Sequence, residues 1–102
     1  MFIAMNRFRI ALGKEEAFVE TWRQRETFLD EVPGFKRFNL LRGPSHDDHT
    51  LFVSHSVWES RQAFEDWTRS EAFRKAHAQA GAAKDIYLGP PQFEGFESVL
   101  SS

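Results

Sequence analysis

The side chains best suited to ligand chemistry lie in one stretch of the sequence, from Trp58 to His77. Trp67 offers a flat indole ring, and His77 offers an imidazole, which binds metals in its neutral form. The apolar residues of this stretch recur at intervals of three and four, which predicts amphipathic helix. One helical face carries Phe64 and Trp67, and another carries Phe73, Ala76, His77 and Ala80. The indole and the imidazole can serve one ligand only if the chain brings these two faces together.

A bend at Ser70 would bring them together. In one straight helix Trp67 and His77 would lie about 15 Å apart along the axis, too far apart to serve one small ligand. Ser70 is a favourable N-cap residue, so a new helix can begin directly after it. We therefore predict a helix over residues 60–68, a corner at Ser70 and a second helix over residues 71–80.

The elements around this stretch follow the order β-α-β-β-α-β. Residue patterns predict strands over residues 2–10, 35–42, 50–58 and 92–100, and a first helix over residues 14–30. This is the order of a split βαβ unit, so we predict an antiparallel four-stranded sheet with its helices on one face, the ferredoxin-like α+β plan. The other sheet face would have no cover within the chain. A second copy is the simplest cover, which predicts a homodimer with the two sheets packed face to face.

Asn6 and Arg25 are polar residues on otherwise apolar faces. A buried Asn6 amide must find hydrogen-bond partners. It is either a structural amide bonded to backbone, the commoner case, or it points at a polar group in a pocket. Arg25 falls on the helical stripe of Phe18 and Trp22. Its guanidinium either lies in water, again the commoner case, or faces an anionic ligand.

Two connecting segments and one strand histidine have competing interpretations. The hairpin loop over residues 43–49 contains His46, Asp47, Asp48 and His49. A metal site there is the less favoured interpretation, because any solvated turn has a similar composition. The connection over residues 81–91 ends in Gly-Pro-Pro and is predicted to be a mobile segment of the kind that forms lids. His55 is expected to be a packed or hydrogen-bonded residue of the sheet rather than a ligand.

The composition limits the partners of the chain. Residues 1–102 suffice for a single domain, and the eleven Phe and three Trp exceed the needs of a modest core, which indicates a ligand pocket, an oligomer interface or both. The absence of Cys excludes disulfides and thiolate ligands. A net charge of −2 without a basic block excludes a nucleic-acid binder. No signal peptide is evident and no apolar run approaches the roughly 20 residues that span a bilayer, so we expect a cytoplasmic protein without membrane contact.

The chain resembles one protein family over nearly its whole length, from Phe2 to Leu100. Asn6-Arg7 on the first predicted strand matches the N-terminal signature of the IsdG-type haem-degrading monooxygenases, which belong to the antibiotic-biosynthesis-monooxygenase (ABM) superfamily of dimeric α+β barrels. The later part of the signature resembles the pattern that reads here Trp58-x-Ser60-x-x-Ala63-Phe64-x-x-Trp67-x-x-Ser70-x-x-Phe73-x-x-Ala76-His77. The resemblance identifies the chain as a single ABM-like haem oxygenase domain.

This resemblance implies a role for each candidate residue. It implies that His77 is the proximal ligand of haem iron, that Trp67 presses on the porphyrin face and that Asn6 hydrogen-bonds near the distal ligand. Further haem contacts are implied for Trp22, Arg25, Phe64 and Phe73. Of these, Arg25 is the candidate contact of a haem propionate. From periodicity alone His77 would be a helix-end histidine and Trp67 a core residue, and the resemblance reverses both interpretations.

The implied activity is oxidative opening of haem, which is both substrate and cofactor. An external reductase or small reductant supplies electrons, dioxygen binds opposite His77, and a meso carbon of the porphyrin is hydroxylated. Iron and a bilin-type tetrapyrrole are released, which implies a role in acquiring iron from haem. The segment over residues 81–91 would cover the haem edge.

Two other functions are compatible with the same residues. One is a cofactor-independent monooxygenase of the same superfamily that oxidises a quinol or a polycyclic phenol, for which His77 would be incidental. The other is a non-catalytic dimer that binds haem for storage or transfer, or that binds no small molecule. His77 is the residue that favours haem.

Overall fold

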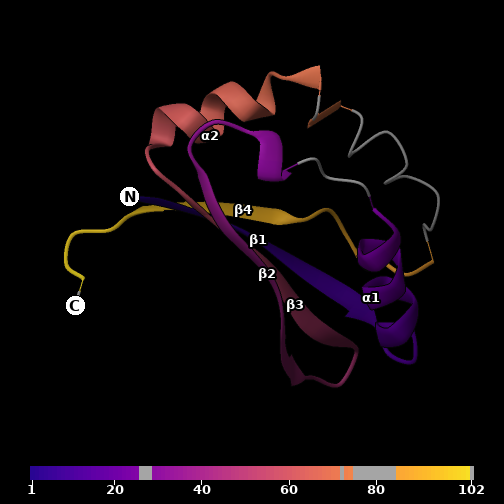
Figure 1. Cartoon of the computed structure of the whole chain (residues 1–102). Coiled ribbons are helices and arrows are strands. Elements are labelled where there is room, and N and C mark those ends of the chain that lie inside the picture. The colour runs from indigo at the N-terminus through magenta and orange to yellow at the C-terminus, as the bar shows by residue number, and fades with distance from the viewer. Residues whose placement is uncertain (26–28, 72, 75–84, 102) are drawn as a thin grey trace.

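The computed structural model describes residues 1–25, 29–71, 73–74 and 85–101. Seven helices and strands are assigned within these residues. The strands are β1 (Phe2–Ala11), β2 (Phe35–Ser45), β3 (His49–Trp58) and β4 (Gln92–Glu97). The helices are α1 (Glu15–Gln24), the 3-10 turn η1 (Leu29–Glu31) and α2 (Arg61–Thr68). Figure 1 shows their course along the chain.

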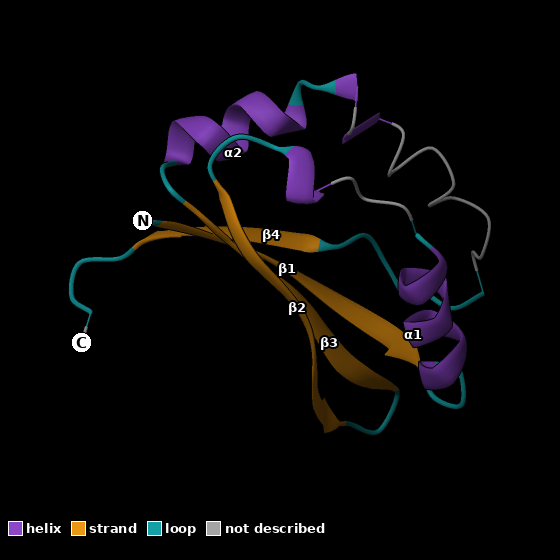
Figure 2. Ribbon diagram, in the orientation of Figure 1, coloured by secondary structure: helices purple, strands orange, loops and turns teal. Residues whose placement is uncertain are grey.

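The four strands form one antiparallel sheet in the order β2-β3-β1-β4. Both α1 and α2 lie on the same side of this sheet, α1 toward one end of the strands and α2 toward the other (Figure 2). This is the ferredoxin-like α+β fold that the order of elements predicts.

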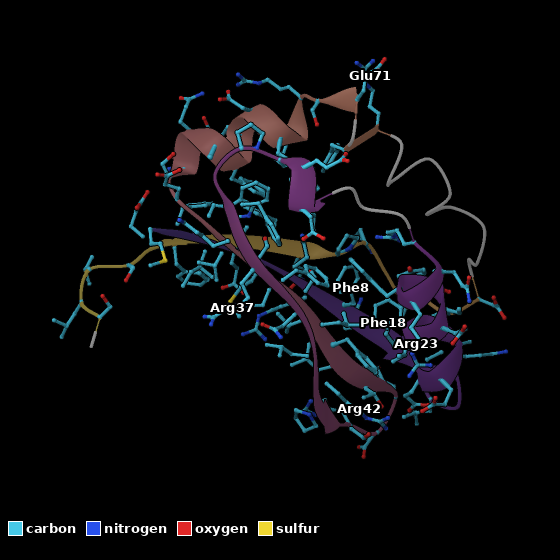
Figure 3. The ribbon with its side chains drawn as sticks, viewed as in Figure 1. Phe8, Phe18, Arg23, Arg37, Arg42 and Glu71 are labelled. Carbon is cyan, nitrogen blue, oxygen red and sulfur yellow. The ribbon has the colours of Figure 1, made fainter. Side chains whose placement is uncertain are left out.

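Two apolar clusters fill the space between the sheet and the helices. The α1 cluster consists of Phe8, Ile10, Phe18, Phe52 and Ile86, and the α2 cluster consists of Phe2, Ala4, Leu29 and Trp58. The rings of Phe8 and Phe18 meet between β1 and α1, with their centroids 5.3 Å apart (Figure 3). Because side chains alternate along a strand, the even-numbered residues of β1 supply both clusters, and Asn6 lies between them.

The first helix is shorter than its pattern predicts. The prediction of a helix over residues 14–30 is wrong at Arg25, whose backbone is extended with φ −75° and ψ 126°, and at residues 29–30, which lie in η1. Residues 26–28 lie outside the described residues. Leu29 is buried in the α2 cluster, beside Trp58. A continuous helix would place Leu29 about 16 Å along its axis from Phe18. The chain instead leaves the helix at Arg25, and Leu29 is buried beside Trp58.

The strand ends also differ from the sequence prediction. β2 continues to Ser45 and β3 begins at His49, so the loop predicted over residues 43–49 is shorter. An irregular register between Arg42 and Ser45 accommodates the proline in β2, which cannot donate a ladder hydrogen bond. The strand predicted over residues 92–100 ends at Glu97, which pairs with Phe2 at the start of β1. The Ser98 N–H still donates to the Met1 carbonyl at 2.9 Å, and the Val99 and Leu100 side chains beyond it are exposed.

The connection predicted to be mobile is attached to β1 in its described part. The Ala11 N–H donates to the Ile86 carbonyl at 2.8 Å, and the Leu88 N–H donates to the Arg9 carbonyl at 3.0 Å. Ile86 is buried in the α1 cluster. Residues 86–88 are therefore paired with β1, residues 81–84 lie outside the described residues, and a role of this connection as a lid stays a prediction.

Candidate functional site

A hydroxyl group joins α2 to the helical turn that follows it. The Ser70 hydroxyl donates to the Trp67 carbonyl at 2.6 Å and accepts from the Phe73 N–H at 3.2 Å. It thereby closes the end of one helix and caps the start of the next. The predicted corner at Ser70 is confirmed. His77 lies outside the described residues, so its position beside Trp67 stays a prediction.

Trp67 is surrounded by aromatic rings on both sides of this corner. Its ring centroid lies 5.2 Å from that of Trp58 and 4.8 Å from that of Phe73, with the Phe73 contact edge to face at 87°. Phe64, one turn earlier on α2, lies 6.0 Å away. Trp67 is half-buried, so part of its indole is open to a ligand or to solvent.

The rings of Trp58, Phe64, Trp67 and Phe73 form an aromatic wall on the α2 side of the site. Phe64 extends this wall to the edge of the sheet. Its ring stacks on that of Phe93 in β4, with centroids 5.5 Å apart and planes 9° apart. It also contacts Phe2 of β1 at 5.4 Å. The aromatic residues of α2 therefore cover the end of the sheet where β1 begins.

Asn6 lies between the two apolar clusters on the face that the helices cover. It is half-buried, and its side chain forms no hydrogen bond with another described residue. Asn6 pairs with Ser54 on β3 and with Phe93 on β4. The pattern alone favours a structural amide bonded to backbone, and the described residues contain no such bond. The amide is free to meet a polar group above the middle of the sheet.

Trp22 forms the aromatic wall on the α1 side. Its ring stacks on that of Phe38 in β2, with centroids 5.4 Å apart and planes 22° apart, and it meets Phe8 edge to face. The indole Nε1 is buried and has no acceptor among the described residues. A buried N–H without an acceptor is costly, so this atom is suited to a ligand acceptor.

The guanidinium of Arg25 covers the Trp22 ring, with its Cζ 4.2 Å from the ring centroid. The prediction that Arg25 continues the α1 stripe is wrong, since its backbone is extended, yet the two side chains remain in contact. Burial lowers the pKa of Arg25, and the nearby Tyr87 acts in the opposite direction. None of the ion pairs between described residues involves Arg25. A partly buried cation without a carboxylate partner can bind an anionic group.

Two residues near the site are absent from the sequence prediction, Ser54 and Tyr87. Ser54 is buried opposite Asn6, and Tyr87 packs against the α1 cluster and forms an isolated bridge with Ile10. The signal that would have found Ser54 is the register of β3 on β1, which the sequence does not specify. His55 lies on the other sheet face, half-buried and paired with Met5.

The hairpin histidines do not form a metal centre in the described part of the chain. The His46 and His49 rings stack with centroids 4.7 Å apart, and His49 Nδ1 lies 2.6 Å from an Asp48 carboxylate oxygen. No group of three or more His, Asp or Glu among the described residues is arranged to hold a metal ion.

None of the described helices has the length and apolar character to cross a membrane.

Comparisons with known proteins find relatives of this chain both in sequence and in structure. The heme oxygenase (staphylobilin-producing) 1 of Staphylococcus aureus strain Newman is 29% identical over 89 residues, covering 87% of this chain and 82% of that protein. The heme degrader MhuD of Mycobacterium tuberculosis, solved with two hemes bound in its active site, is 28% identical with a TM-score of 0.74, covering 100% of this chain and 99% of that chain. A mutant of SnoaB, a cofactor-independent oxygenase of Streptomyces nogalater, shares the fold at 20% identity and a TM-score of 0.69, over 98% and 95% of the two chains.

The sequence also matches a family as a whole. The sequence model of the antibiotic biosynthesis monooxygenases matches residues 1–79, which is well over half of the chain. The match contains β1, α1, the β2–β3 hairpin and α2, the elements that carry Asn6, Trp22 and Trp67. This chain belongs to the antibiotic biosynthesis monooxygenase family.

Proposed function

We propose that this protein is a haem-degrading monooxygenase that opens the porphyrin ring and releases iron and a bilin-type tetrapyrrole. The observation that carries the proposal is the half-buried Asn6 amide, which has no partner among the described residues and lies between two aromatic walls. The similarity to two haem-degrading proteins supports it. The role in the cell would be iron acquisition from haem, in the cytoplasm.

The described residues fit haem in their chemistry. Haem combines a flat apolar ring with two carboxylates, so its site needs aromatic surfaces and a cation. Trp67 and Phe64 on one side and Trp22 on the other supply such surfaces. Arg25 supplies a cation that no carboxylate among the described residues neutralises, as a propionate contact requires.

Each candidate residue then has a defined task. His77 would hold the iron through its imidazole, Trp67 would press on the porphyrin face, and Asn6 would donate a hydrogen bond to a polar ligand. Phe73 would keep Trp67 in place through their edge-to-face contact. Bound haem supplies the redox-active iron, and dioxygen and electrons from an external reductase or small reductant are co-substrates.

A homodimer is part of the proposal, because the sheet face opposite the helices carries apolar side chains. Ile3, Met5 and Val53 are only half-buried there, and Phe96 is 45% exposed. Register places these residues on one face: Ile3 pairs with Phe96, and Arg7 pairs with Val53. A second copy packed on this face would remove their apolar surface from water.

Haem titration tests the proposed function. The metal-free protein is titrated with hemin while the Soret band is followed for wild type, His77→Ala and the control His46→Ala, whose histidine lies in the exposed hairpin. Ascorbate is then added with catalase present. We expect a saturable Soret shift that requires His77 and not His46, then bleaching and a bilin-like absorbance. A shift without bleaching would indicate a haem carrier, and no shift would favour a cofactor-independent oxygenase or a non-enzymatic dimer.

A further inference from the structure

The covered face of β3 carries three hydroxyl side chains, and they differ in their hydrogen bonding. The Thr50 hydroxyl donates to a Glu15 carboxylate oxygen at 2.8 Å. The Ser56 hydroxyl accepts from Trp58 Nε1 at 2.9 Å and lies 3.4 Å from the Ala4 carbonyl. Ser54 is 7% exposed, and its hydroxyl has no hydrogen-bond partner among the described residues. Ser54 is thus the hydroxyl of this face that the described residues do not satisfy.

Ser54 also lies directly opposite Asn6 in the pairing of β1 with β3. Facing residues of an antiparallel pair have Cβ atoms about 4.5–5.5 Å apart, close enough for one atom to bridge their side chains. No hydrogen bond joins the side chains of Asn6 and Ser54, although both lie on the face that the helices cover. Both therefore present hydrogen-bonding groups to the same small volume.

The neighbours of this pair on the covered face are apolar apart from Ser56. Ala4 and Phe8 flank Asn6 along β1, Phe52 precedes Ser54 on the same face of β3, and Phe93 pairs with Asn6 from β4. A polar atom that is buried in such surroundings is costly unless a ligand or a water molecule binds it. The pair lies between the α1 cluster and the α2 cluster. The proposed site lies between the same two clusters.

We propose that Ser54 is a second hydrogen-bonding residue of the site, which together with Asn6 binds one polar atom of a small ligand. In the resting protein a water molecule would occupy this position. In the haem complex the ligand would be a small anion or another polar molecule that binds beside Asn6 and Ser54. This inference rests on the proposed function for the identity of the ligand, and on the pairing of Asn6 with Ser54 for its place.

The haem complex gives the first test. Azide affinity of the ferric haem complex is measured by Soret titration for wild type, Ser54→Ala, Ser54→Thr and Asn6→Ala, with the double variant of Asn6→Ala and Ser54→Ala. Loss of a donor to an anion should weaken azide binding about tenfold in Ser54→Ala, while Ser54→Thr keeps its hydroxyl and should stay within about twofold. The double variant should lose less than the product of the single effects, because both residues bind one atom.

The matched control is Ser56→Ala, which removes a hydroxyl that is bonded within the protein. It should lower the midpoint of thermal unfolding and leave azide affinity unchanged. Equal azide affinity in wild type and Ser54→Ala, or an equal loss in Ser56→Ala, overturns the inference.

A second measurement needs no haem. If Asn6 and Ser54 share one water molecule, Ser54→Ala should shift the Asn6 side-chain amide resonances in the NMR spectrum of the haem-free protein, and Ser56→Ala should not. Unchanged Asn6 amide resonances overturn the inference whether or not haem binds. Failure of the wild type to shift the Soret band instead overturns the proposed function, so the two failures are distinct.

Discussion

The ring of Phe73 meets the indole of Trp67 edge to face at 4.8 Å, across the corner that the Ser70 hydroxyl forms. The helical turn after Ser70 therefore begins in direct contact with the aromatic residues of α2. The Ser70 hydroxyl bonds to the end of α2 and to the start of that turn.

Replacement of this hydroxyl should affect stability and haem affinity together. Ser70→Ala removes the cap, and we expect a loss of about 1 kcal/mol in the free energy of unfolding, measured by urea titration, with several-fold weaker hemin binding. Ser60→Ala is the matched control, because Ser60 caps the N-terminus of α2 through the Ala63 N–H at 3.1 Å. It should lower stability to a similar extent without weakening hemin binding. Equal hemin affinity in Ser70→Ala and wild type would show that the corner does not position the haem ligand.

The charge of Arg25 should matter for haem with free propionates and not for the esterified form. Arg25→Ala should weaken hemin binding about tenfold, the size of a charge-assisted hydrogen bond. The affinity for hemin dimethyl ester should be the same for wild type and variant, because the ester has no anionic group. Arg23→Ala is the control, since Arg23 is exposed on α1 and pairs with Glu20 at 2.9 Å. An equal loss for hemin and its ester would assign Arg25 a packing role over Trp22.

Acid should weaken the contact between α1 and the sheet. The pKa of Glu15 is lowered from its usual 4.5, first by a hydrogen bond from its own backbone N–H and then by the Thr50 hydroxyl. A carboxylate with a lowered pKa stabilises the fold above its usual pKa, and this contribution is lost as pH falls through the lowered value. Urea unfolding at a series of pH values below 5 should therefore show a smaller loss of stability in Glu15→Gln than in wild type. Glu16→Gln, its exposed neighbour, should behave as wild type, and a parallel decline in all three proteins would exclude Glu15 as the cause.

A charge on the uncovered sheet face should disrupt the proposed homodimer. Phe96→Glu places a carboxylate among apolar side chains that the second copy would bury, so sedimentation velocity should show a dimer for wild type and a monomer for the variant. Leu12→Glu is the control, because Leu12 is similarly exposed and lies in the turn between β1 and α1. A wild-type monomer, or a dimer that persists in Phe96→Glu, would contradict the proposed arrangement.

The sequence predicts the local features of this fold well. Alternation finds β1, and the capping chemistry of Ser70 finds the corner after Trp67, because both signals depend on residues near each other in the chain. The end of α1 at Gln24 has no such local signal. It depends on burial of Leu29 in a cluster whose other members come from β1 and β3.

The same limit explains what the sequence leaves unpredicted in the candidate site. Asn6 stands out because it interrupts an apolar alternation, whereas Ser54 becomes notable only when the register places it opposite Asn6. The attachment of residues 85–89 to β1 is equally non-local, since a Gly-Pro-Pro segment has the composition of a free loop. These features depend on pairing between residues that are far apart in the chain, and a short stretch of sequence does not reveal such pairing.

The pairing of β1 also predicts an order of local opening within the molecule. β3 lies along one side of β1 for its whole length, while β4 and then residues 86–88 lie along the other side. Amides enclosed in this way exchange with solvent only when most of the structure opens. Hydrogen–deuterium exchange should thus be slowest in β1 and faster in α1 and α2. The strand that carries Asn6 would remain closed while the helices above it open and admit a bulky ligand.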